Sequence, residues 1–124
     1  MDRLLELFVG YFSYIGGGNT MTITSSCDGG ALTLAFEGEL DHHAAREAML
    51  GIERDIERYL PRACVLDLAR LSFMDSSGIA VILKAHRRMA ELGGTASVVG
   101  AGKQPYKVLD AAGLRRLVKI ETTV

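Results

Sequence analysis

The spacing of apolar residues changes repeatedly along the chain, and this alternation restricts the possible folds more than any other feature. Runs rich in β-branched residues alternate with segments whose apolar residues recur every three or four positions. In chain order these segments are strands at 22–26 and 31–36, a helix at 41–60, a strand at 63–68, a helix at 76–92, a strand at 96–99, a helix at 106–112 and a strand at 117–120. The order ββαβαβαβ predicts an α/β fold, a small mixed β-sheet flanked by helices.

Local signals explain several of these boundaries. Asp28-Gly29-Gly30 separates the first two strands and is typical of a hairpin turn. Pro61 ends the first helix, and Gly93-Gly94 ends the second. The nearly all-apolar run at 63–68 predicts a central strand that is buried on both faces.

Length and composition exclude several classes of protein. With 124 residues, 48% hydrophobic residues and a net charge of −1, the chain is the size of one domain and can bury a core. The near-neutral charge disfavours a protein that binds nucleic acid directly through a basic patch. Cys27 and Cys64 are too few for a disulfide scaffold, so we expect reduced thiols and a cytoplasmic protein.

The first twenty residues differ from the rest of the chain. Residues 4–15 are strongly apolar, but 12 residues are fewer than the roughly 20 that a membrane span needs. Their apolar positions recur at helical spacing, which predicts an amphipathic helix, and the alternative is a disordered extension without a role. We therefore divide the chain into an N-terminal apolar extension at residues 1–20 and a domain at residues 21–124.

Asp41-His42-His43 precedes the first helix and has residue types that bind metals. Adjacent histidines point in different directions, and no second Asp/His cluster is present in the sequence to complete a coordination shell. We therefore predict no metal site. The simpler interpretation is that Asp41 is the N-cap of the helix.

A second polar cluster, Asp75-Ser76-Ser77-Gly78, lies where the second helix begins. An N-cap explains one polar residue there, but not three in succession. The cluster lacks the G-x-S-x-G pattern of a serine hydrolase, and the chain has no P-loop. A hydroxyl at a helix N-terminus can carry a phosphate, because unpaired N–H groups and the helix dipole favour negative charge.

Three strings carry a family resemblance: Gly38-Glu39-Leu40-Asp41-His42-His43, Phe73-Met74-Asp75-Ser76-Ser77-Gly78 and Val108-Leu109-Asp110-Ala111-Ala112-Gly113-Leu114. In order and spacing they resemble the STAS domain of anti-sigma factor antagonists over residues 21–122. Within this family, the GELDHH string resembles the sequence of the branch that antagonises the sporulation anti-sigma F factor.

The resemblance implies a STAS fold and a non-enzymatic regulator without a cofactor. It implies that the unphosphorylated protein binds an anti-sigma factor, itself a serine kinase, and so releases a sigma factor. Phosphorylation of Ser77 would switch binding off, and a serine phosphatase would restore it. The implied partner-binding residues are Asp41, His42, Asp75, Ser76, Ser77 and Gly78.

The chain departs from the family pattern at two places. Its N-terminal extension is longer than usual, and Lys103-Gln104-Pro105-Tyr106 replaces the Ser-Pro expected before the third helix.

Two other functions stay open. One is a nucleotide-binding or nucleotide-hydrolysing STAS-like domain that uses Asp41 and the serine pair, although neither motif contains Lys or Arg. The other is a STAS scaffold that binds different partners through second-helix residues such as Leu83 and Arg87.

Overall fold

The computed structural model describes residues 8–16 and 19–122. Its elements are β1 (Phe8–Gly16), β2 (Asn19–Asp28), β3 (Ala31–Leu40), α1 (His42–Tyr59), β4 (Ala63–Met74), α2 (Ser77–Glu91), β5 (Thr95–Ala101), α3 (Lys103–Ala111), the 3-10 turn η2 (Leu114–Arg116) and β6 (Lys119–Thr122). From β2 onward, this order confirms the predicted ββαβαβαβ arrangement.

The strands form one mixed sheet in the order β1-β2-β3-β4-β5-β6. The β1–β2 and β2–β3 pairs are antiparallel, whereas the pairs from β3 to β6 are parallel and each is connected through a helix. Gly29 and Gly30 form the predicted hairpin turn with φ values of 58° and 85°, a conformation that side chains with a Cβ rarely adopt. The predicted α/β class is confirmed.

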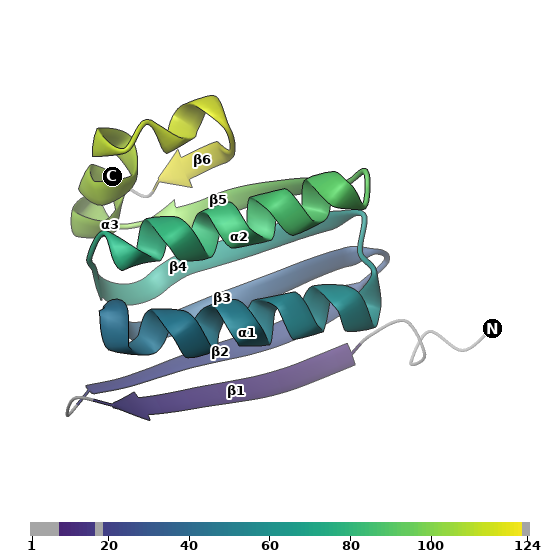
Figure 1. Ribbon diagram of the computed structural model, residues 1–124, viewed down its shortest axis with the longest axis horizontal. Coiled ribbons are helices and arrows are strands. Elements are labelled where there is room, and N and C mark those ends of the chain that lie inside the picture. Colours follow the sequence, from purple (N-terminus) through teal and green to yellow (C-terminus); the bar gives the residue numbers. More distant parts are fainter. Residues whose placement is uncertain (1–7, 17–18, 123–124) are drawn as a thin grey trace.

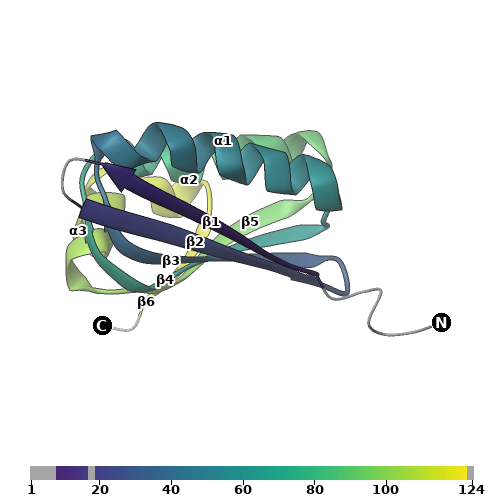
Figure 2. The same cartoon turned by 90° about the horizontal axis from the view of Figure 1, so that it is seen from below.

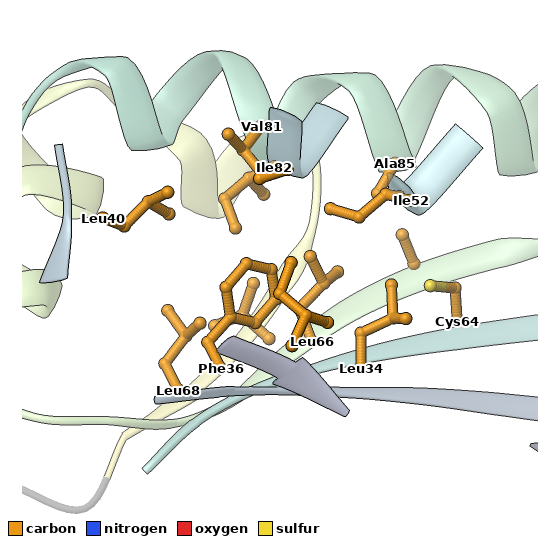
Figure 3. Close-up of a cluster of buried hydrophobic side chains, with 14 of the residues drawn as sticks. Leu34, Phe36, Leu40, Ile52, Cys64, Leu66, Leu68, Val81, Ile82 and Ala85 are labelled. Carbon is orange, nitrogen blue, oxygen red and sulfur yellow. The ribbon is translucent and has the colours of Figure 1, made fainter. Parts of the chain in front are cut away.

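Helices α1 and α2 run side by side across one face of the sheet, and the core lies between them and the strands (Figures 1 and 2). Phe36 and Leu66 point from the sheet toward Ile52 and Ile82 of the helices (Figure 3), and all four side chains are buried. Three small residues of α1, Ala44, Ala45 and Ala48, are buried on the helix face that packs toward the sheet. Burial of this apolar layer supplies the main stabilisation of the fold.

Strand β4 lies in the middle of the sheet, as predicted, but it is not buried on both faces. Leu66 and Leu68 are fully buried under the helices, whereas Val65 and Asp67 on the opposite face are only half-buried. The strand also continues to Met74, six residues beyond the predicted end. Local apolar content indicated a strand here, but the helix arrangement determines which face is covered.

The helix predicted for the N-terminal segment is wrong. Residues 8–16 form strand β1 rather than an amphipathic helix, and β1 pairs with β2 along its whole length. An edge strand presents a row of free N–H and C=O groups, and pairing with them stabilises an added strand regardless of its helical spacing. Residues 4–7 of the predicted helix lie outside the described residues, as do residues 1–3 before it. The boundary between residues 20 and 21 stays a prediction.

The C-terminal elements are shifted from their predicted positions. Helix α3 begins at Lys103 rather than Tyr106, because a proline in the first helical turn costs no hydrogen bond. The last strand begins at Lys119, after the turn η2, and Leu117 before it is 54% exposed. At the end of the first helix, Leu60 adopts a left-handed conformation as C-cap and is exposed.

Both cysteines are free and buried, which agrees with the expected reduced thiols. Burial, and to a smaller extent the Asp55 carboxylate, raises the pKa of the Cys64 thiol to about 12. Among the residues described, no helix combines the length and apolar character required to span a bilayer.

Candidate functional site

The Asp75 carboxylate joins the N-termini of the two long helices. Its Oδ2 accepts a hydrogen bond from the backbone N–H of His42 at 3.1 Å, and its Oδ1 accepts one from the backbone N–H of Ser77 at 2.8 Å. These are the first residues of α1 and α2. Each helix N-terminus carries roughly half a positive charge, so one carboxylate stabilises both helix ends. The two sequence clusters predicted as functional therefore form one site.

Asp41 caps α1, as predicted from the sequence. Its backbone is extended, and its carboxylate Oδ1 accepts a hydrogen bond from the Ala44 N–H at 3.0 Å. The preceding residue, Leu40, accepts a hydrogen bond from the Asp75 N–H through its carbonyl oxygen at 3.2 Å. Both acidic residues are thus held by the parallel ends of β3 and β4, which place the helix N-termini at the same edge of the sheet.

The two serines differ in their surroundings. Ser76 is the N-cap of α2, its side chain makes no capping hydrogen bond, and the residue is exposed. Ser77 is half-buried, is the first helical residue and is tied to Asp75 through its N–H. The Asp75 carboxylate performs the capping that a serine hydroxyl would otherwise perform. The Ser76 hydroxyl is therefore presented to solvent at a helix N-terminus.

Gly78 is buried beneath this loop. A Cβ at this position would overlap the Met74 side chain and would approach Leu40 Cδ2 to 3.4 Å. Met74 itself is fully buried. Close packing therefore favours glycine at position 78. Backbone conformation is not the reason, because the φ of Gly78 lies outside the left-handed region.

The histidines lie at the outer rim. His42 Nδ1 is 4.0 Å from Asp75 Oδ2, and the His42 side chain is 70% exposed. The His42 and His43 rings have centroids 3.9 Å apart, and their planes are tilted by 38°. Within the described part of the chain, no three His, Cys, Asp or Glu side chains gather in a way that could hold a metal ion.

Next to the serines, the structure has a shallow hollow of about 440 Å³ between α2 and α3. It is lined by Ser76, Ile79, Lys107, Val108, Ala111 and Ala112. Its walls are mainly apolar, and Lys107 is the one charged residue among these lining residues.

Two residues near the site, Lys107 and Gln104, had no site role predicted from the sequence, where Gln104 was noted only as part of a departure from the family pattern. The Gln104 side-chain amide hydrogen-bonds the backbone of Met74, directly before Asp75. The proline at position 105 was the available signal, since proline is common in the first turn of a helix and would have moved the start of α3 to include Gln104.

Comparison with known proteins gives one family match and several relatives. The family model of the STAS domain matches residues 22–124. The anti-sigma F factor antagonist of Paenibacillus polymyxa is 34% identical over 91 residues, which cover 73% of this chain and 78% of that protein.

Two solved structures share the fold. The anti-sigma factor antagonist SpoIIAA in its unphosphorylated form has a TM-score of 0.66 and 23% identity, with coverage of 92% of this chain and 90% of that one. An anti-sigma factor antagonist from Mycobacterium paratuberculosis has a TM-score of 0.73 and 21% identity, with coverage of 82% and 85%.

Proposed function

The chain belongs to the STAS domain family, and on this premise we propose that it is an anti-sigma factor antagonist. Family membership confirms the resemblance indicated by the three sequence strings. The name of the Paenibacillus polymyxa relative supports the proposed role, as does the likeness of fold to the two solved antagonists. In this proposal the protein is a cytoplasmic regulator rather than an enzyme, and its partner is an anti-sigma factor.

We further propose that the partner is a serine kinase and that phosphorylation of the loop between β4 and α2 switches binding off. The observation that carries this proposal is the exposed Ser76 hydroxyl at the junction of two helix N-termini. A phosphate there would be stabilised by the positive end of α2, so the fold need not open. A serine phosphatase would reset the switch.

The resemblance selects Ser77 as the acceptor, but accessibility favours Ser76. A kinase must reach the hydroxyl from outside, and Ser76 is exposed whereas Ser77 is half-buried within the first turn of α2. We therefore propose Ser76 as the acceptor, with Ser77 as the second candidate. Asp41, His42, Asp75, both serines and Gly78 form the proposed partner-binding surface.

Charge provides the mechanism of release. Phosphorylation adds about 1.5 to 2 negative charges. One unit charge at about 5 Å from a partner carboxylate costs about 3 kcal/mol at an effective dielectric constant of about 20. This corresponds to roughly a hundredfold loss of affinity. The phosphate would also lie beside the Asp75 carboxylate, which adds to the negative charge of the surface.

The test is phosphoryl transfer from Mg-ATP by the cognate anti-sigma factor kinase, followed by intact-mass measurement and peptide mapping. We expect one phosphate on the wild type and on Ser77→Ala, and none on Ser76→Ala. Loss in Ser77→Ala with retention in Ser76→Ala would identify Ser77 instead. Absence of both transfer and binding, with a folded protein, would contradict the proposed function.

A second candidate function is nucleotide binding in the hollow beside the serines. Lys107 supports it, because a cation next to a helix N-terminus suits a phosphate. Titration calorimetry with Mg-ATP and Mg-GTP tests it directly. Micromolar binding that Lys107→Ala weakens would favour this function, whereas no heat of binding would exclude it.

A further inference from the structure

Strand β4 extends past the end of its pairing with β5. The register between these strands ends at Asp67↔Val99, whereas β4 continues to Met74 with β3 as its partner on the other side. Gly100, at φ 72°, bends the chain near this point, and α3 follows from Lys103. The final residues of β4 therefore run beyond the strand partner on the β5 side.

A side chain of α3 provides the hydrogen bonds that a neighbouring strand would have made. The Gln104 Nε2 donates to the Met74 carbonyl at 2.8 Å, and the Gln104 Oε1 accepts from the Met74 N–H at 2.9 Å. One primary amide thus satisfies the donor and the acceptor of one backbone residue. Figure 1 shows α3 at the same end of the sheet as the start of α2.

Both edges of the strand end are therefore held. Gln104 binds Met74 on one side, and the Leu40 carbonyl accepts from the Asp75 N–H on the other. The buried Met74 side chain lies against Gly78 beneath the loop. Any shift of Met74 is transmitted through one peptide unit to Asp75 and then to the serines.

From this geometry we infer that Gln104 is a positioning residue for the serine loop. It holds the loop so that the acceptor hydroxyl faces the kinase, and in this respect the inference rests on the proposed function. Both hydrogen bonds come from one side chain, because a primary amide carries a donor and an acceptor.

The experiment compares Gln104→Leu, Gln104→Glu and Lys103→Leu. Leucine removes both hydrogen bonds. Glutamate keeps an acceptor for the Met74 N–H but, when ionised, lacks the donor, and it provides a second variant in case the leucine variant does not fold. Lys103 is the matched control, because it is exposed on the same turn and its side chain makes no hydrogen bond or ion pair with the residues that the structure describes.

Two measurements are made on each folded variant. The first is hydrogen exchange of the Met74 amide by NMR, which we expect to be about tenfold faster in Gln104→Leu, intermediate in Gln104→Glu and unchanged in Lys103→Leu. The second is phosphoryl transfer by the kinase. We expect kcat to fall about tenfold in Gln104→Leu with little change in KM, because a misplaced hydroxyl affects transfer more than docking.

The outcomes separate the inference from the proposed function. Unchanged Met74 exchange in Gln104→Leu would overturn the inference. Faster exchange with unchanged kcat would reduce Gln104 to a structural contact and overturn its positioning role. If the wild type accepts no phosphate while Met74 exchange responds as expected, the proposed function fails together with the role in transfer, and the contact between Gln104 and Met74 is supported.

Discussion

Replacing Asp75 by alanine should loosen α1 and α2 at the same time. The carboxylate accepts hydrogen bonds from the first N–H of each helix, at 3.1 and 2.8 Å, and its side chain is 31% exposed. An ordinary N-cap residue serves one helix, whereas Asp75 serves two whose first residues lie 35 positions apart (77 − 42) in the chain.

The expected magnitude follows from N-cap energetics. Loss of one N-cap side chain costs about 1 kcal/mol, so loss of the shared acceptor should lower the free energy of unfolding by about 2 kcal/mol. With an unfolding entropy of about 2.1 cal/mol/K per residue, this corresponds to a fall in Tm of about 8 °C for a chain of this length. Asp75→Asn keeps one acceptor oxygen and should lose about half as much.

The assay is urea denaturation followed by circular dichroism, together with amide exchange at His42 and Ser77. Asp110→Ala is the control, because Asp110 is an exposed carboxylate whose partner Arg115 is 3.8 Å away, and such surface pairs contribute little. The midpoint should fall for Asp75→Ala only, and both amides should exchange faster. Faster exchange at Ser77 alone, or equal midpoints for the two variants, would refute the bridging role.

Three further predictions follow from packing and charge. Gly78→Ala should lower the free energy of unfolding by about 1 to 3 kcal/mol in urea denaturation, because the new Cβ overlaps Met74. Gly102→Ala is the control and should be neutral, because its Cβ would meet open space. Cys64 should make stability fall between about pH 9 and pH 12. The thiol has a pKa of 9.0 in the unfolded chain and about 12 in the folded protein, so the folded state binds more protons between these pH values. The free energy of unfolding of Cys64→Val should therefore fall less steeply with pH in this range. Equal slopes for Cys64→Val and the wild type would count against this account. Arg88→Met should lower the urea midpoint, because Arg88 pairs with Glu53 and Glu57 of α1 and with Glu91 of α2. The difference in midpoint from the wild type should shrink in about 1 M salt, which screens ion pairs. A difference that does not change with salt would indicate lost packing instead.

Several features of the fold were predictable because their causes are local. The turn at Gly29-Gly30 needs two residues that tolerate positive φ, and Asp41 is a good N-cap directly before an amphipathic stripe. These signals depend on neighbours within a few positions. They predicted the element order, the α/β class and the first helix start.

The candidate site was predictable in its residues but not in its arrangement. The sequence indicated Asp41, Asp75 and the two serines as separate clusters. That the Asp75 carboxylate links His42 to Ser77 depends on β3 and β4 ending side by side, which no local pattern encodes. The choice between the two serines likewise depends on their exposure in the folded chain.

Sequence alone therefore determined which segments are helices or strands from β2 onward, since capping, turn chemistry and apolar periodicity act over a few residues. Only the tertiary structure decided that residues 8–16 are a strand, that β4 is covered on one face, and that Gln104 holds Met74 from 30 positions away. For β4 and Gln104 the deciding partner is distant in the chain. For residues 8–16 it is the neighbouring strand β2, whose backbone N–H and C=O groups outweigh the local helical spacing.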